Sequence, residues 1–594
     1  MSKELFKNTT RGGQVILHDL RMLCQVLWKT FLWALPIFLI ASWLCFFRLT
    51  NLETKSVGEQ WVNAKINQFF NGKHHTLKYT TPDGQIIKVY PQQITTASFV
   101  QNALTELKAA AEHSLLFGGI VYLSCVIIIL LWLHKKGHFH TEDKHLKGDY
   151  LSTIKVVNQM ITQQKRQSDL TFGKEKLMLP KLSELQHILV HGTTGCGKST
   201  VIKELLDHIR RRGERAIVYD KSCNLMGLFY QPDSDKLLNP LDSRGVVWDL
   251  WQECRDKADF DNLDAALIPM SAHVHDPFWI NAARTILAVA AYNMRNSLSR
   301  STLALLNSLL NADTTELQQL LKGTEAESLM SEKAEKTAAS IKTVLATYLK
   351  SLCYLQDGDD PFSIRSWIQE DTARGWLFIS SLGDKHETLK PLISTWLDIA
   401  INALLSLPES PERRIWIILD ELGSLQQLPY LTAALAESRK FGGCFVVGIQ
   451  SYAQLAKIYS HEGGREISSL LNTRFLFRVP DPEIAQWSAK NLGETTLEET
   501  QEGISYGTTS HKDGVSIQKI ERERSVVPAA EIMRLPDLSC YVRLAGAYPI
   551  TKLQASYQER VMKHTAFLPV FDSKIKTRQI AHKVQLEDIE KIFS

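Results

Sequence analysis

A glycine-rich segment followed by a lysine and a serine carries the first candidate chemistry of this chain. The stretch LQHILVHGTTGCGKST, residues 185–200, passes from an apolar run into the spacing Gly-x-x-x-x-Gly-Lys-Ser. Glycines let successive backbone N–H groups surround phosphate oxygens at the start of a helix. The pattern therefore predicts a nucleotide-binding phosphate loop whose members are Gly192, Thr193, Thr194, Gly195, Cys196, Gly197, Lys198, Ser199 and Thr200.

Two side chains of the phosphate loop have predicted roles toward ATP and Mg²⁺. The Lys198 amine would reach the β- and γ-phosphates, and the Ser199 hydroxyl would ligate the metal. The loop leaves an apolar run at 187–191 and precedes a predicted helix at 200–212. This strand-to-helix context is the one that such a loop needs.

A second apolar run, RIWIILDEL, ends in two adjacent carboxylates. Asp420 would lie at the carboxyl end of a buried strand, beside Mg²⁺. Glu421 would polarise a water molecule for in-line attack on the γ-phosphate. A solvated loop could also contain an Asp-Glu pair, but the preceding apolar strand favours an NTPase that hydrolyses its nucleotide.

Gln450 closes a third apolar run, GCFVVGIQ at 443–450. An amide at the end of a strand next to the one that carries Asp420 is placed to sense the γ-phosphate. The alternative is an ordinary polar strand end.

Short apolar runs rich in β-branched residues must position these side chains. They occupy residues 187–191, 215–220, 375–380, 414–421, 443–450 and 473–479. Each is typical of a strand buried on both faces, and helical segments separate most of them, so the pattern predicts an α/β fold with a parallel sheet.

Residues 255–355 interrupt this alternation with an all-α insertion. They contain one glycine, Gly323, and two prolines, Pro269 and Pro277, and this scarcity of helix breakers predicts helices throughout. Basic side chains could face nucleic acid here or simply be solvated helix faces. These are Lys333, Lys336, Lys342 and Lys350, together with Arg210, Arg211 and Arg212 outside the insertion.

Two long uncharged runs, residues 30–47 and 114–133, predict transmembrane helices. A signal peptide for the first run and a buried core helix for the second are the alternatives. ATP is cytoplasmic, so the intervening loop 48–113 would be periplasmic in a bacterial inner membrane. This loop has no cysteine, and its stretch HTLKYTTPDGQIIKVYP predicts a hairpin beside a helix near 97–112.

Composition excludes several classes of protein. The nine cysteines form no C-x-x-C pair, which excludes a zinc ribbon and a dense disulfide framework. A net charge of +4 argues neither for nor against nucleic acid, since any basic surface would have to be local.

The order of these parts resembles the type IV coupling proteins of conjugation systems, and among them the TraD type. The resemblance covers about residues 1–560. It rests on the blocks HGTTGCGKS, LLNPLDSRGVVWDLW (237–251), DPFWINAARTIL (276–287), LKPLISTWLDIAINALL (389–405), WIILDELGSLQQL (416–428), ESRKFGGCFVVGIQS (437–451) and LPDLSCYVRLAGAYPITKL (535–553).

The resemblance implies a hexameric inner-membrane ATPase with a RecA-like P-loop domain. Such a protein receives the relaxase–DNA complex from the relaxosome and passes it to the secretion channel by ATP hydrolysis. Lys198 and Ser199 would be the Walker A pair, Asp420 and Glu421 the Walker B pair, and Gln450 the glutamine that couples nucleotide state to DNA. Arg439 would be an arginine finger that reaches the neighbouring subunit, although from the residues alone it could equally be a surface helix residue.

These expectations divide the chain into successive parts. They are the cytoplasmic N-terminus (1–29), the first transmembrane helix (30–47), the periplasmic α+β domain (48–113), the second transmembrane helix (114–133), the linker and start of the nucleotide-binding domain (134–180), the RecA-like P-loop domain in two parts (181–254 and 356–560), the all-α inserted domain (255–355) and the C-terminal tail (561–594). The tail is shorter than is usual for the family, and a docking peptide and a frayed helix are both compatible with it. Residues 501–516 are expected to form a mobile loop.

Three other functions remain compatible with parts of this pattern. One is a coupling receptor for protein effectors with little DNA activity. Another is a non-hydrolytic membrane scaffold, and a third is a chromosome-segregation motor. DNA bound by the expected motor would be recognised without sequence preference and with a strong salt dependence.

Overall fold

The computed structural model describes residues 2–70, 76–80, 85–141, 144–270, 276–298, 300–330, 335–356, 358, 360–505 and 514–570. The chain forms two compact units, and each is considered by itself. The first contains residues 1–144 and 499–520, and the second contains residues 145–498 and 521–594.

Two long helices form most of the first unit: α1 (Ser2–Leu49) and α4 (Ser98–Thr141). Their stretches Leu20–Leu49 and Ser98–Lys136 are long and apolar enough to cross a membrane. The two helices pack against each other around Tyr122, whose hydroxyl donates to the Phe31 carbonyl at 3.2 Å and whose ring meets that of Phe38 edge-on.

A small α+β module connects these helices. It consists of α2 (Leu52–Phe70), the antiparallel hairpin β1 (Leu77–Thr80) and β2 (Ile86–Val89), and α3 (Pro91–Thr96). Ala64, Tyr79 and Ile94 form its core. The predicted hairpin is confirmed, with its Pro-Asp-Gly turn outside the described residues; the helix expected near 97–112 is the beginning of α4, and α2 was not predicted.

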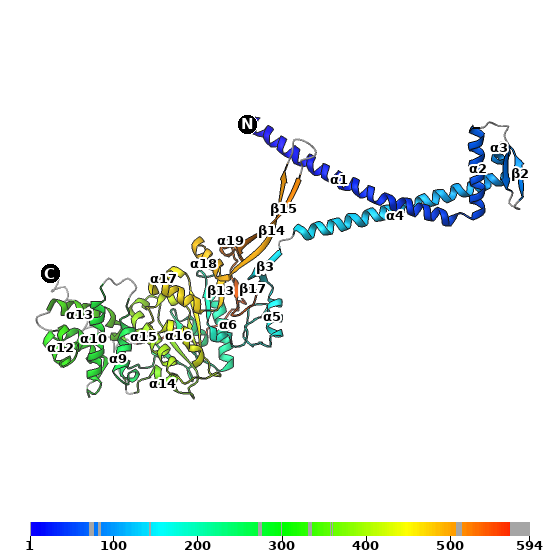
Figure 1. Cartoon of the computed structure of the whole chain (residues 1–594). Helices are drawn as coiled ribbons and strands as arrows, with labels where there is room; N and C mark the ends of the chain where they lie inside the picture. The colour runs from blue at the N-terminus through cyan, green and yellow to red at the C-terminus, as the bar shows by residue number, and fades with distance from the viewer. Residues whose placement is uncertain are drawn as a thin grey trace. The chain divides into compact units, whose positions relative to one another are not determined.

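A ten-stranded sheet organises the second unit (Figure 1). Its strand order is β4 (Leu151–Ser152), β17 (Ile550–Gln554), β16 (Ser539–Arg543), β13 (Thr473–Phe477), β7 (Ile188–His191), β12 (Gly443–Ile449), β11 (Ile415–Leu419), β8 (Arg215–Asp220), β10 (Trp376–Ser380) and β9 (Lys236–Leu238). All six runs predicted as strands are strands, and they pair in parallel as expected.

Beyond the six predicted strands, the sheet becomes antiparallel at one side, which the sequence pattern did not predict. Strand β16 is antiparallel to β13, and β17 is antiparallel to β16. A short connection joins β16 to β17, and a short connection can return the chain only in the antiparallel sense.

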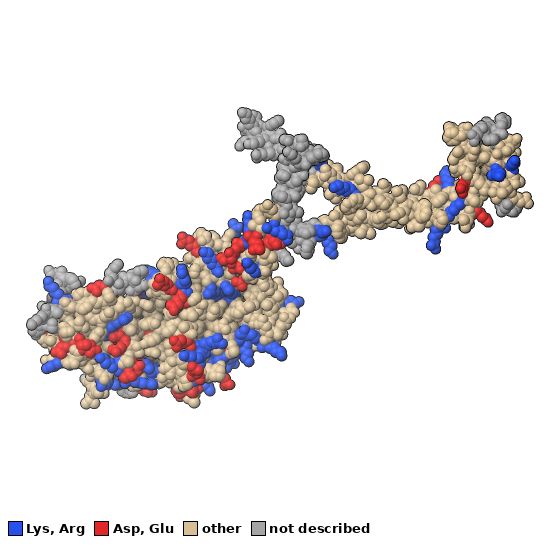
Figure 2. Space-filling view, in the orientation of Figure 1, with Lys and Arg blue, Asp and Glu red and all other residues tan. Residues whose placement is uncertain are grey.

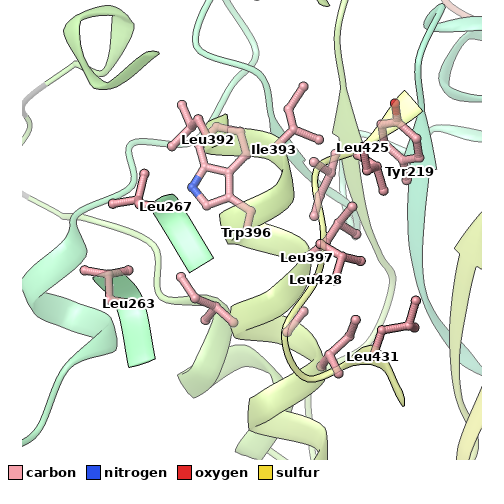
Figure 3. Packing of buried hydrophobic residues seen from close by; sticks show 14 of the residues in the cluster. Tyr219, Leu263, Leu267, Leu392, Ile393, Trp396, Leu397, Leu425, Leu428 and Leu431 are labelled. Carbon is pink, nitrogen blue, oxygen red and sulfur yellow. The ribbon is translucent and has the colours of Figure 1, made fainter. Parts of the chain in front are cut away.

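Both faces of this sheet are buried, as the apolar runs predicted. On β11, Ile415, Ile417 and Leu419 enter one hydrophobic cluster, whereas Trp416 and Ile418 enter the other, as the two-residue period of a strand requires. The first cluster packs against α15 (His386–Leu405), whose Trp396 is 1% exposed (Figure 3). The second packs against α5 (Ile154–Gln163), α6 (Lys198–Arg212) and α7 (Asn224–Phe229).

Helices fill the segment predicted to be all-α, and no strand occurs among its described residues. They are α9 (Lys257–Leu267), α10 (Phe278–Met294), α11 (Thr302–Leu306), α12 (Thr314–Leu320) and α13 (Glu335–Leu349), with short helical turns between and after them. They gather at one end of the second unit (Figure 1) and share the hydrophobic cluster that covers one face of the sheet.

The prediction of a mobile loop over 501–516 is wrong at both of its ends, which are strands. Strands β14 (Glu494–Ser505) and β15 (Gly514–Ser525) extend into it, and residues 506–513 lie outside the described residues. Strand pairing satisfies backbone N–H and C=O groups whatever the side chains are, so an apolar period is not required.

Candidate nucleotide-binding and hydrolysis site

The phosphate loop connects the end of β7 to the start of α6. Backbone hydrogen bonds to the ends of the neighbouring strands hold its first residues. The Gly192 N–H donates to Ile449 O at 3.3 Å, and the Thr193 N–H donates to Arg478 O at 3.0 Å. At Gly192 a Cβ atom would lie 2.6 Å from Phe477 Cβ, so a side chain cannot be accommodated there. The helix begins at Lys198, two residues earlier than predicted, because Gly197 with φ of 119° serves as its N-cap.

Lys198 is buried inside the curve of the loop. Its Nζ donates to Gly192 O at 2.7 Å and to Thr193 O at 2.9 Å. The first N–H groups of α6 have no partner within the helix, so together with the amine they make this point attractive to phosphate oxygens. Ser199 and Thr194 are exposed at the same place.

The two carboxylates follow β11 directly and lie close to the loop. Burial raises the pKa of Asp420, and the positive charges of Lys198 and Lys203 oppose that rise. Burial also raises the pKa of Glu421, opposed by a hydrogen bond from Gln450. Glu421 Oε1 is buried and has no hydrogen-bond partner among the described residues, so one carboxylate oxygen is left for a group that the protein itself does not supply.

Gln450 connects the phosphate loop to this carboxylate. Its Nε2 donates to Glu421 Oε2, and its Oε1 accepts a bond of 3.4 Å from the Thr194 hydroxyl. The structure thus brings Thr194, Lys198, Asp420, Glu421 and Gln450 together at the edge of the sheet where β7, β11 and β12 end, which we call the carboxyl edge.

Arg439 lies elsewhere. It belongs to a short 3-10 helix, η7 (Ser438–Phe441), that precedes β12, so it stands at the opposite edge of the sheet from Gln450. Its side chain is exposed and lines a groove of about 770 Å³ together with Glu409, Pro411 and Lys440. The structure does not bring Arg439 to the phosphate loop of its own chain.

The sequence alone does not decide whether several basic residues face nucleic acid or solvent. In the structure some of them bind other parts of the chain. Arg210 binds Asp235 at 2.7 Å and stacks on Trp376, and Arg212 pairs with Asp169. In the all-α segment, Lys342 Nζ donates to Ala312 O at 2.5 Å. Lys333 lies outside the described residues. Acidic and basic side chains are interspersed over the visible face of the second unit (Figure 2), so neither charge sign covers that face alone.

Asp220 was not identified from the sequence as a buried carboxylate near the site. This residue ends β8, the strand beside β11. Its carboxylate accepts from the N–H groups of Met226 at 2.9 Å and Ser222 at 3.3 Å, and burial raises its pKa to about 6. The signal was available, because an acidic residue closes the apolar run RAIVYD.

The residues of the carboxyl edge fit ATP and Mg²⁺. The exposed hydroxyl of Ser199 and the carboxylate of Asp420 are oxygen ligands of the kind that Mg²⁺ prefers, and the unpartnered Oε1 of Glu421 is available to a water molecule. Among the described residues no group of three or more His, Cys, Asp and Glu could hold a metal. In nucleotide sites Mg²⁺ is held chiefly by phosphates, water and one or two protein oxygens.

Comparisons with known proteins agree with this geometry. Residues 172–556 match the family of the type IV secretion-system coupling protein DNA-binding domain. The chain is 38% identical over 587 residues to the coupling protein TraD of Escherichia coli K12, a match that covers 95% of this chain and 79% of TraD.

Solved structures give the same assignment. The plasmid coupling protein TrwB in complex with ADP and Mg²⁺ is 30% identical, with a TM-score of 0.64 over 72% of this chain and 98% of that chain. TrwB in complex with a non-hydrolysable ATP analogue gives the same values. The second unit therefore has the RecA-like fold with an inserted all-α domain, and the chain belongs to the family of type IV secretion-system coupling proteins.

Proposed function

We propose that this coupling ATPase of a conjugative type IV secretion system hydrolyses ATP at the phosphate loop 192–200 to drive DNA toward the secretion channel. The observation that carries the proposal is the hydrogen-bonded series Thr194, Gln450 and Glu421. It links the loop that would hold phosphate to a carboxylate with one unpartnered oxygen. A protein that only binds nucleotide has no need of such a carboxylate.

Each side chain has a role in this proposal. Lys198 would exchange the loop carbonyls for the β- and γ-phosphates and neutralise their charge, and Ser199 and Asp420 would hold Mg²⁺. Bound Mg²⁺-ATP supplies the phosphoryl group and its charge stabilisation. Glu421 orients the attacking water and accepts its proton at Oε1, while the bond from Gln450 to Oε2 fixes the direction of the carboxylate.

Gln450 is suited to report the nucleotide state. It is bonded to the phosphate loop through Thr194, and α17 (Tyr452–Leu470) follows it after one residue. A phosphate that competes for the Thr194 hydroxyl would change this bond, and the change would pass directly into the helix.

Arg439 requires a second copy of the chain. Because it lies at the opposite edge of the sheet from its own phosphate loop, it can act on ATP only in a neighbouring subunit. The structures of TrwB in complex with ADP and Mg²⁺ and with a non-hydrolysable ATP analogue support nucleotide binding by this chain. We infer a homo-hexameric ring in which Arg439 stabilises the γ-phosphate charge of the next subunit.

The membrane arrangement follows from the site. Since ATP is cytoplasmic, the second unit lies in the cytoplasm, the two apolar helices cross the inner membrane, and the module at residues 48–113 is periplasmic. The ring would receive the relaxase–DNA complex, with the segment 255–355 at the entrance, and pass it to the secretion channel.

The test is ATP hydrolysis by the full-length protein in nanodiscs, with and without single- and double-stranded DNA, over a series of salt concentrations. DNA should raise the rate, and the effect should decrease steeply with salt because the contacts are with phosphates. Lys198→Ala should abolish hydrolysis. A rate that does not respond to DNA would favour a receptor for protein effectors, and no hydrolysis at all would favour a scaffold.

A further inference from the structure

A buried hydrogen-bond network lies directly behind the turn that carries Glu421. It contains Tyr219 from the end of β8, Ser381 immediately after β10, His386 at the start of α15, and Ser424 from the short helix η6 (Leu422–Ser424). All four side chains are buried, and His386 and Ser381 are completely inaccessible. Among the described residues, none of these four side chains has a hydrogen bond to the phosphate loop.

The chemistry of the atoms fixes the direction of each bond. His386 Nε2 lies 2.9 Å from Ser424 O, and because a carbonyl only accepts, Nε2 carries the proton. His386 Nδ1 is then the acceptor for the Ser381 hydroxyl at 2.9 Å. Burial lowers the pKa of His386, which agrees with a neutral ring that has one donor and one acceptor.

The same reasoning applies to Ser424. Its hydroxyl is 2.8 Å from Glu421 O and donates to that carbonyl. The Tyr219 hydroxyl, 2.7 Å from Ser424 Oγ, is therefore the donor in their contact. His386 thus binds the carbonyl of Ser424 and Tyr219 binds its hydroxyl. Ser424 in turn binds the Glu421 carbonyl.

We propose that His386 is a positioning residue for hydrolysis, which fixes the turn 421–424 and so the direction of the Glu421 carboxylate. The carboxylate itself is held by Gln450 at one oxygen only, so its direction depends on the backbone that carries it. A displacement of about 1 Å at such a group can reduce the rate by ~10²-fold. This inference rests on the proposed role of Glu421.

The consequence is a separation of hydrolysis from binding. His386 supports the turn behind Glu421, whereas the phosphates would be held by the loop 192–200 and by Lys198. A variant without the ring nitrogens should therefore have a lower kcat and a nearly unchanged KM for ATP.

The experiment compares His386→Leu, His386→Gln and Ser381→Ala in the full-length protein in nanodiscs with DNA. We expect His386→Leu to lower kcat by ~10- to 100-fold, with KM for ATP and Kd for Mg²⁺-ADP changed less than about 3-fold. His386→Gln keeps a donor toward Ser424 O and should recover part of this loss. Thr395→Val, which removes a buried hydroxyl that bonds only within the same helix, is the matched control and should retain the parental kcat.

Two results would overturn the inference: an unchanged kcat in His386→Leu, or an equal loss of kcat and of Mg²⁺-ADP affinity. If His386→Leu does not fold, Ser381→Ala decides, since it should still lower kcat by a few fold at unchanged KM. Failure of the inference can be told apart from failure of the proposed function with Glu421→Gln. In that background His386→Leu should have no further effect on kcat, because both changes act on one group.

Discussion

Replacement of Glu421 by glutamine tests the hydrolytic mechanism with little structural disturbance. The amide has the size of the carboxylate, and its oxygen can accept from Gln450 Nε2 as Glu421 Oε2 does. The hydrogen bond between the two side chains is therefore kept. What disappears is a base at the unpartnered Oε1.

The expected magnitude follows from that single loss. A positioned general base contributes ~10²- to 10⁴-fold, which corresponds to about 3–5 kcal/mol of the activation barrier. The raised pKa of Glu421 brings it nearer to the working pH, where a base is most effective. Parental activity should also decrease as the pH falls through this raised pKa, because a protonated carboxyl cannot accept a proton. The glutamine variant should lack that dependence.

The assay is single-turnover hydrolysis of ATP beside equilibrium binding of Mg²⁺-ADP. We expect a loss of ~10²-fold or more in the hydrolysis rate, with Kd for Mg²⁺-ADP within a few fold of the parent. A variant that hydrolyses ATP at the parental rate would refute the assignment of Glu421 as the base. Equal losses of hydrolysis and binding would show instead that the carboxylate supports the fold of the site.

Three further outcomes follow from the structure. Lys198→Ala should weaken Mg²⁺-ADP binding by ~10-fold or more, because a buried cation is removed from the phosphate loop; titration with a fluorescent ADP measures this. Arg439→Ala should bind nucleotide normally but hydrolyse it ~10²- to 10³-fold more slowly. If the arginine acts between subunits, mixing this variant with inactive Lys198→Ala subunits should restore part of the rate, because the Lys198→Ala subunit supplies Arg439 to a neighbour with an intact phosphate loop. Burial raises the pKa of Asp398 to about 7, so the folded protein holds a proton that the unfolded chain has lost between about pH 4 and 7, and stability falls as pH rises through that range. The thermal midpoint of Asp398→Asn should therefore decrease less from pH 5 to pH 8 than that of the parent.

Much of this architecture could be predicted from short-range patterns. The phosphate loop, the strands that carry Asp420 and Gln450, and the helical segment 255–355 all have strong local signals, namely glycine spacing, apolar runs and scarcity of helix breakers. Each of these signals depends on residues close in sequence, so no knowledge of the tertiary structure is needed.

What the sequence could not provide depends on contacts between distant segments. Strand β9 has only three residues and pairs with β10 across the whole all-α segment. The series of bonds from Ser381 through His386 to Ser424 joins segments 38 residues apart, and Tyr219 enters from 205 residues away. Nothing in the local sequence of His386 distinguishes it from any other histidine at the start of a helix.

In the proposed ring, the placement of Arg439 would let the same sheet serve both hydrolysis and the contact between subunits. Strand β12 has Gln450 directly after its last residue and Arg439 four residues before its first, and it is buried along its whole length. The neighbouring strand β7 has the phosphate loop at one end, while at the other His187 donates to Leu435 O at 2.9 Å and accepts from the Phe445 N–H at 3.2 Å. Strand β12 is paired with β11 and β7 and packed on both faces, and a close-packed interior of this kind transmits strain. In the proposed ring, a shift at Gln450 when ATP is hydrolysed would therefore reach Arg439 and change the site of the next subunit, so that the subunits would hydrolyse ATP in a coordinated order and not independently.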